Sequence, residues 1–196
     1  MSNNTENILK TKLSMLNEAL SVLDIRMLAD IVDVLVKCIR RKNKILVCGN
    51  GGSASDSQHF TAELVGKFVK IRKPVACISL NSDTSTLTCI SNDFGYEQAF
   101  SRQIEGIGNK GDVLVVFSTS GDSNNVLLAV QTAKICGLTT VAFLGKNGGS
   151  VNKHADYSLV IRSEQTDTIQ ECHEILMHTV VWDIEELLEV SEGAQL

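Results

Sequence analysis

The stretch KILVCGNGGSASDSQHFTAEL, residues 44–64, joins a short apolar run to a glycine-rich turn and then to a segment of helical spacing. An unbroken apolar run is typical of a strand that is covered on both faces. Four more such runs follow, at residues 75–80, 112–118, 139–145 and 157–161. Because stretches long enough for crossover helices separate the runs, the pattern predicts an α/β fold with a doubly wound, five-stranded parallel sheet flanked by helices.

The chain before residue 44 reads as two helices. Residues 5–23 place one set of apolar side chains near a single helical face: Ile8, Leu13, Leu16, Leu20 and Leu23. Residues 27–43 repeat the pattern and end in basic residues, which suit a helix C-terminus. A chain of 196 residues is usually one domain. We therefore expect a single domain over 1–196, with helices in 1–43 used for packing or oligomerisation and an α/β core in 44–196.

Composition limits the classes of function. The net charge of −5 argues against a nucleic-acid surface built on broad electrostatics. No apolar stretch approaches membrane-spanning length, and the polar N-terminus has no signal core. The six cysteines form no C-x-x-C pair and are expected to be reduced, mostly buried thiols. The sequence thus predicts a cytoplasmic protein with no nucleic-acid or membrane partner.

The glycine-rich turn fits the dinucleotide-binding fingerprint only loosely. That fingerprint also requires an acidic residue near the end of the next strand, to hold a ribose hydroxyl. The next apolar run, at 75–80, is followed by Asn81, and the segment before it is basic. A dinucleotide-dependent oxidoreductase is therefore not expected.

A second turn, STSGDS at residues 118–123, is rich in hydroxyl groups and precedes a predicted helix. Its hydroxyl-bearing side chains are Ser118, Thr119, Ser120 and Ser123. Together with the free N–H groups of a helix start they could hold one phosphate group. An ordinary turn, with Asp122 or Ser123 as the helix N-cap, is an equally good interpretation of this stretch alone.

Two helical segments carry candidate metal or acid–base residues. His59 and Glu63 are four residues apart and so share one face of a helix that we expect to begin at Ser53, with Asp56 completing a capping box. The long amphipathic helix predicted at 168–190 and its start carry a second polar set: Asp167, Gln170, His173, Glu174 and His178. These residues could form a nitrogen and oxygen site for zinc, or only a surface ion pair and satisfied core groups. The spacing does not show that the two helices meet.

Four motifs in this order resemble the phosphoheptose isomerase family of the sugar-isomerase (SIS) fold: GNGGSASDSQHFTAEL, SNDFGYEQAF, FSTSGDSNN and TDTIQECHEILMH. The resemblance covers nearly the whole chain. It implies an isomerase that converts sedoheptulose 7-phosphate to D-glycero-D-manno-heptose 7-phosphate through an enediol. This reaction is the entry to bacterial heptose synthesis for lipopolysaccharide, capsule or other glycans. It also implies a homotetramer with active sites near subunit interfaces.

The resemblance assigns roles to particular positions. Glu63 and His178 match the acid–base pair, and His59, Glu63, Gln170 and His178 match the zinc positions. The substrate positions are Asn50, Gly51, Gly52, Ser53, Glu63, Asn92, Asp93, Ser118, Thr119, Ser120, Ser123, Asp167 and Gln170. A carboxylate tied to zinc is a poorer base, so we assign Glu63 as base and His178 as acid and leave the catalytic role of zinc open.

Two alternatives remain within the same fold. One is a non-catalytic relative that binds the bacterial replication initiator protein, a group that lacks the glutamate corresponding to Glu63. This chain keeps Glu63, Gln170 and His178, which favours the enzyme. The other is an isomerase of a hexose or pentose phosphate, whose pocket chemistry would be nearly the same.

Overall fold

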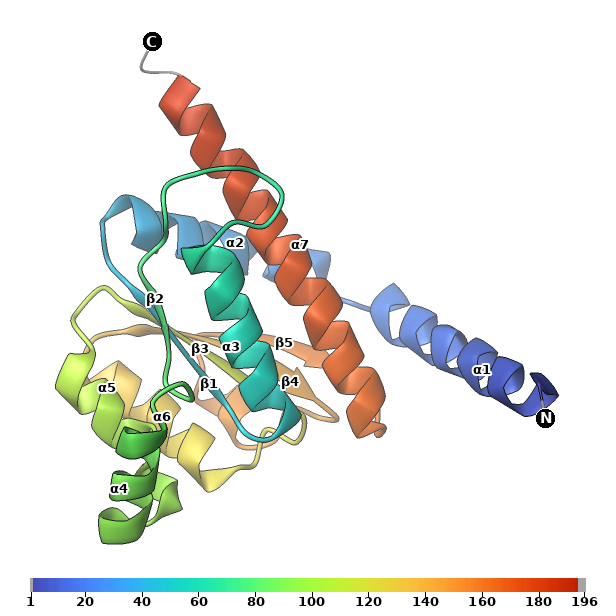
Figure 1. Cartoon of the computed structure of the whole chain (residues 1–196), viewed down its shortest axis with the longest axis horizontal. Coiled ribbons are helices and arrows are strands. Elements are labelled where there is room, and N and C mark those ends of the chain that lie inside the picture. The colour runs from blue at the N-terminus through green and yellow to red at the C-terminus, as the bar shows by residue number, and fades with distance from the viewer. Residues whose placement is uncertain (1, 194–196) are drawn as a thin grey trace.

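A five-stranded parallel sheet forms the centre of the protein in the computed structural model, which describes residues 2–193 (Figure 1). The strands are β1 (Ile45–Gly49), β2 (Cys77–Ser79), β3 (Val113–Ser118), β4 (Thr139–Gly145) and β5 (Tyr157–Ile161). Their order across the sheet is β2-β1-β3-β4-β5, and every neighbouring pair is parallel. The predicted fold class and all five strand positions are confirmed, although β2 is shorter than the apolar run that predicted it.

Helices cover both faces of this sheet (Figure 1). One face carries α2 (Ile25–Arg40), α3 (Gly52–Val65) and α7 (Thr166–Gly193), and the other carries α5 (Ser101–Ile107) and α6 (Asn124–Ile135). The segment after β2 contains α4 (Thr84–Phe94), as predicted for residues 81–93. Short 3-10 turns, η1 (Tyr96–Gln98) and η2 (Val151–Lys153), complete the connections. The first helix, α1 (Ser2–Ser21), projects from the body beside the start of α7.

The strands are apolar throughout because both of their faces are buried. In β3, Val113, Val115 and Phe117 pack into the core under α2, α3 and α7. Leu114 and Val116 point the opposite way, into the core under α5 and α6. Successive side chains of a strand alternate between faces, so a strand covered on both sides needs an unbroken apolar run.

The N-terminal helices follow the predicted positions, but the first one buries only part of its apolar face. Leu16, Leu20 and Leu23 pack against the core. Ile8 and Leu13, which were predicted on the same face, are 55% and 57% exposed. The described part of the chain therefore leaves the outer half of α1 uncovered.

The cysteines bear out the expectation of free thiols. Cys38, Cys48, Cys77 and Cys172 are buried and Cys136 is half-buried, whereas Cys89 is exposed. All six are free. Burial raises the pKa of Cys38 to about 11 and that of Cys77 to about 12, so these thiols stay protonated and unreactive at neutral pH. None of the helices in the described residues combines the length and apolar character of a membrane span.

Candidate functional site

The first part of the candidate site is the turn after β1, at the carboxyl edge of the sheet. The chain crosses from one side of β1 to the other between β2 and β3, so the space above β1 and β3 is the switch point where ligands bind in such sheets. Asn50 and Asn125 bridge that space by two hydrogen bonds of 2.8 and 2.9 Å between their amides. The Tyr96 hydroxyl also donates to Asn50 Oδ1, at 2.8 Å. Asn50 is thereby fixed beside the start of α6.

The second part of the candidate site is the hydroxyl-rich turn after β3, which lies next to the turn after β1. The Ser118 Oγ is buried and accepts the N–H of Gly121 at 3.0 Å, and the Ser120 Oγ accepts the N–H of Asp122 at 3.2 Å. Ser123 occupies the N-cap position of α6, but its side chain makes no capping hydrogen bond. Asp122 instead accepts the N–H of Ser150, at 2.8 Å, and joins this turn to the next one. Ser123 thus leaves N–H groups at the start of α6 without its cap, although the N–H of Val126 donates to Asn125 Oδ1 at 3.0 Å. Free N–H groups at a helix start are what an anion site uses.

The start of α3 differs from the prediction. The helix begins at Gly52 rather than Ser53, after Gly51 with φ +58, and no side chain caps it. Asp56 is not part of a capping box but is 3% exposed, and its Oδ2 has no hydrogen-bond partner in the described chain. The predicted capping box is therefore wrong, and Asp56 lies on the buried side of α3.

Helices α3 and α7 lie side by side, which the sequence could not show (Figure 1). At their N-terminal ends, the Gln170 amide lies against Gly52, where a Cβ would collide with it. Further along, the His59 Nε2 is 3.2 Å from Glu63 Oε1 and 3.4 Å from His178 Nε2. On the other side of the ring, the His59 Nδ1 is 3.2 Å from the carboxylate of Glu174. The structure thus brings together the predicted His59, Glu63 and His178, and adds Glu174.

This arrangement fits a divalent metal ion. His59, Glu174 and His178 can each place one ligand atom within 4.8 Å of the others. In a tetrahedral zinc site with bonds of about 2.0–2.1 Å, two ligand atoms are separated by about 3.3 Å. The His59 Nε2 lies 3.2 Å from Glu63 and 3.4 Å from His178, close to that separation, although Glu63 is not in the three-residue group. Imidazole and carboxylate are also the ligand types that zinc prefers among nitrogen and oxygen donors.

The charge around His59 favours a cation as well. Asp56, on the same helix as Glu63, is close enough to Glu174 and His59 for their charges to act on its carboxyl. Burial, and then the charge of Glu174, raises the pKa of Asp56 to about 7, although His59 partly opposes the shift. The carboxylates of Glu63 and Glu174 lie beside one imidazole, with the buried carboxyl of Asp56 nearby, and this grouping favours a bound cation.

His173, in the same polar set of α7, has a structural position instead. It is completely buried against the stacked rings of Phe117 and Phe143, and its Nε2 lies 3.3 Å from the carbonyl oxygen of Leu144. Burial lowers its pKa to about 4, so the ring is neutral at physiological pH. Of the two histidines on α7, only His178 reaches the α3 side chains.

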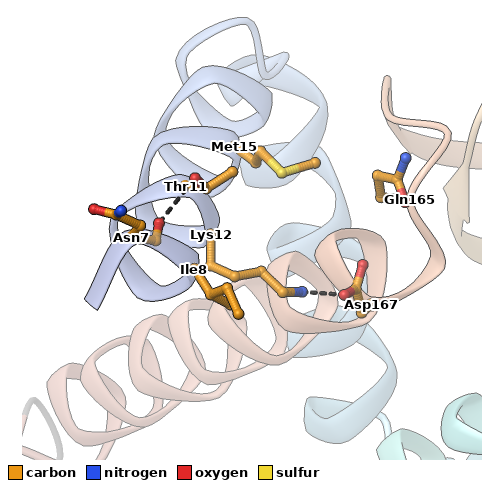
Figure 2. Close-up of a pocket in the computed structure, with 7 residues that line it drawn as sticks. All are labelled: Asn7, Ile8, Thr11, Lys12, Met15, Gln165 and Asp167. Atoms are coloured by element: carbon orange, nitrogen blue, oxygen red, sulfur yellow. Dashed lines mark hydrogen bonds and ion pairs between the residues drawn. The ribbon is translucent and has the colours of Figure 1, made fainter. Parts of the chain in front are cut away.

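Three predicted substrate residues lie apart from this group. Asn92 and Asp93 are exposed near the end of α4, and within the described chain their side-chain hydrogen bonds stay inside that helix. Asp167 is exposed at the start of α7 and forms an ion pair with Lys12 of α1, which lowers the pKa of its carboxyl (Figure 2). A hollow of about 300 Å³ opens beside this pair, lined by Asn7, Ile8, Thr11, Lys12, Met15, Gln165 and Asp167.

The sequence placed Glu174 in the polar set of the long helix but not among the zinc positions, and it lies four residues from both Gln170 and His178 on their helical face. Two other neighbours of the site were missed. Phe68, which stacks on His178, and Asn125, which pairs with Asn50, had no detectable signal in the sequence. Both contacts join segments that are far apart in the chain.

The parallel sheet carries a hydroxyl-rich turn before α6, and the SIS domain family matches residues 11–145. Phosphoheptose isomerase from Helicobacter pylori is 49% identical over 152 residues, 78% of this chain and 79% of that protein. Phosphoheptose isomerase 1 from Campylobacter jejuni is 48% identical over 159 residues, 81% of this chain and 86% of that protein. The solved structure of phosphoheptose isomerase from Neisseria gonorrhoeae has a TM-score of 0.87 at 34% identity, covering 94% of this chain and 98% of that one.

The chain therefore belongs to the phosphoheptose isomerase family of SIS-domain proteins. The expected class of enzyme, an aldose–ketose isomerase, is confirmed with it.

Proposed function

We propose that the protein converts sedoheptulose 7-phosphate to D-glycero-D-manno-heptose 7-phosphate, the first step in making heptose precursors for bacterial glycans such as lipopolysaccharide or capsule. Membership of the phosphoheptose isomerase family supports the substrate. The observation that carries the chemistry is the meeting of Glu63 with His59 and His178 between α3 and α7. A carboxylate and two imidazoles in contact are suited to moving protons between neighbouring carbon and oxygen atoms.

The reaction requires a proton to leave one carbon and return to its neighbour. We assign this transfer to Glu63, which takes the proton from C1 of the ketose and returns it to C2 of the enediol. His178 donates a proton to the carbonyl oxygen at C2 and receives one from the hydroxyl at C1 as the aldehyde forms. Each residue ends the cycle in the protonation state in which it began, as an isomerisation demands.

We assign the sugar to the turn after β1, with Asn50, Gly51, Gly52 and Ser53 as its contacts. The contact between Gln170 and Gly52 supports Gln170 as a neighbour of the same sugar. Asn92, Asp93 and Asp167 stay proposals that rest on the family resemblance. In the described chain Asp167 is already paired with Lys12, so a sugar hydroxyl there would share the carboxylate with that lysine.

The phosphate is assigned to Ser118, Thr119, Ser120 and Ser123 at the uncapped start of α6. Ser120→Ala should raise KM about tenfold and leave kcat within a factor of two, because it removes a donor to a group that does not react. Steady-state kinetics with the sugar phosphate measures both. A fall in kcat with unchanged KM would place Ser120 at the reacting end of the sugar instead.

Zinc is the proposed metal, and the family resemblance gives His59, Glu63, Gln170 and His178 as its positions. Because a carboxylate or imidazole bound to zinc cannot move protons freely, its role in catalysis is left open beside the proton steps assigned to Glu63 and His178. When bound, it would polarise the substrate carbonyl. Glu174 lies at the Nδ1 of His59, so it would orient this imidazole if the metal binds Nε2, and would itself be a ligand if the metal binds Nδ1. Glu174→Gln should therefore weaken zinc binding about 10–100-fold.

Titration of the metal-free protein with zinc, followed by calorimetry, measures this effect of Glu174→Gln. Glu105→Gln, at an exposed position on α5, is the control and should bind zinc as the unaltered protein does. Zinc would be rejected by two results together: the protein purified without chelators contains no metal, and chelators do not change its activity.

The decisive test of function is turnover. The purified protein is mixed with sedoheptulose 7-phosphate, with and without zinc, and formation of the aldose phosphate is followed. If no aldose phosphate forms in either case, the proposed function is wrong. A higher kcat/KM for a hexose or pentose phosphate would support the isomerase of another sugar. Direct binding to the replication initiator protein without turnover would support the regulatory alternative, which retention of Glu63 disfavours.

We propose that the protein is a homotetramer of single-domain subunits, with an α/β core in residues 44–196 and helices in 1–43 that contribute to assembly. The exposed apolar side chains of the projecting α1 support this: Ile8, Leu9 and Leu13 are 55–60% exposed. Light scattering during size-exclusion chromatography measures the mass, and a monomer would contradict the proposal.

The free cysteines of the protein support a location in the reducing cytoplasm. Cell fractionation tests this location.

A further inference from the structure

The loop that follows α3 places an aromatic ring on His178. The rings of Phe68 and His178 are within 7° of parallel, with centroids 5.0 Å apart. On α7, Trp182 lies one turn beyond His178 and meets the other edge of Phe68 at 68°, with centroids 6.4 Å apart. His178 is therefore held between Phe68 and the ring of His59, which meets it edge-on at 4.9 Å.

A buried carboxylate fixes the part of the loop that carries Phe68. Glu185 of α7 is 2% exposed and accepts the N–H groups of Phe68, Val69 and Lys70 at 2.9–3.0 Å. It also pairs with the guanidinium of Arg72 at 3.1 Å. Burial alone would raise the pKa of Glu185, but these donors outweigh it and the pKa is lowered, so the side chain stays charged.

Arg72 also connects the loop and α7 to the end of α3. Its two terminal nitrogens donate to the carbonyl oxygens of Glu63 and Leu64 at 2.6 and 2.8 Å. The Glu185–Arg72 pair thus ties together the last turn of α3, the loop and α7. These are the three segments that carry Glu63, Phe68 and His178, and the proposed steps of the reaction do not use the pair.

We propose that Phe68 is a positioning residue for His178 and that the Glu185–Arg72 pair holds Phe68 in place; this rests on the acid–base role proposed for His178. A half-buried imidazole on a helix surface can rotate about its side-chain bonds. Contact with a parallel ring on one side and His59 on the other leaves one orientation, with Nε2 toward His59. Because small displacements of a catalytic group have large effects on rate, a freed ring would slow the chemical step.

The test compares Phe68→Leu, which keeps an apolar side chain but removes the ring, with Phe68→Tyr, which keeps the ring. Phe68→Leu should lower kcat roughly tenfold and leave KM within about a factor of two, since substrate contacts are unchanged. Phe68→Tyr should retain kcat. Ile71→Ala, at a 92% exposed position of the same loop, is the control for general loosening of the loop and should leave both constants unchanged.

A second readout does not depend on turnover. In the protein without substrate, the ring current of Phe68 should shift the ring-proton NMR signals of His178 upfield. The signals are assigned by their loss in His178→Gln. The shift should disappear in Phe68→Leu, persist in Phe68→Tyr and Ile71→Ala, and shrink in Glu185→Gln, whose neutral amide replaces the carboxylate that binds the loop.

The possible results separate the two proposals. An unchanged kcat together with unchanged His178 signals in Phe68→Leu would overturn the positioning role. Retention of the shift in Glu185→Gln would remove Glu185 from it. If the unaltered protein does not isomerise sedoheptulose 7-phosphate, the proposed function fails, but the NMR comparison still decides whether Phe68 orients His178.

Discussion

Glu63→Gln should reduce kcat by about 10²–10⁴-fold, the range that general acid–base catalysis contributes. The amide of glutamine has nearly the size and shape of the carboxylate, but it cannot accept a proton from carbon. Glu63 is half-buried and 3.2 Å from His59, so the change should remove the base without opening a cavity. Stopped or coupled assays of aldose phosphate formation measure kcat, and circular dichroism checks that the fold is intact.

Two further variants separate the base from other roles of Glu63. Glu63→Asp keeps a carboxylate but withdraws it by one methylene group, so it should retain more activity than Glu63→Gln. Glu105→Gln, the same change at an exposed site on α5, should have no effect. Because Glu63 is also a proposed zinc ligand, the zinc content of each variant is measured alongside. If Glu63→Gln turns over at the normal rate with normal zinc, another group is the base.

The features that the sequence predicted well are those set by neighbouring residues. The strands followed from unbroken apolar runs, because a strand covered on both faces needs apolar side chains at every position. The shared face of His59 and Glu63 followed from their spacing of four on a helix. The hydroxyl-rich turn followed from its place between β3 and α6, where a parallel sheet gathers its ligands.

The features that it missed depend on contacts between distant segments. That α3 meets α7 results from both helices packing on the same face of the sheet, which no local pattern specifies. Asp56 fits the local capping pattern, yet the helix begins at Gly52, after Gly51 with φ +58, and this carboxyl is buried. Phe68 stands in an irregular loop, and its position follows from Glu185, which is 117 residues further along the chain.

The same dependence on distant contacts makes the turn after β3 sensitive to a single methyl group. Gly121 has φ +69, a conformation that costs an L-residue roughly 1 kcal/mol or more. A Cβ there would also collide with the backbone carbonyl of Gly148, in the turn after β4. That turn cannot move away freely, because Val151 donates to the Gly121 carbonyl oxygen at 2.8 Å and Asp122 accepts from Ser150.

Gly121→Ala should therefore lower the free energy of unfolding by about 2–4 kcal/mol, and Tm by about 5–15 °C for a chain of this size. The matched control is Gly106→Ala on α5, where a Cβ meets no atom within 4 Å. In a helix alanine is preferred to glycine, so Tm should stay the same or rise slightly. Thermal unfolding monitored by circular dichroism measures both changes in Tm, which should have opposite signs or differ clearly in size.

The variant also connects stability with the proposed phosphate site. Relief of the clash requires the turn after β3 to shift, and this shift displaces the Ser120 hydroxyl from the start of α6. KM for the sugar phosphate should therefore rise in Gly121→Ala at temperatures where the protein is still folded, and stay unchanged in Gly106→Ala. A destabilised Gly121→Ala with normal KM would mean that the two turns support the fold but that the phosphate binds elsewhere.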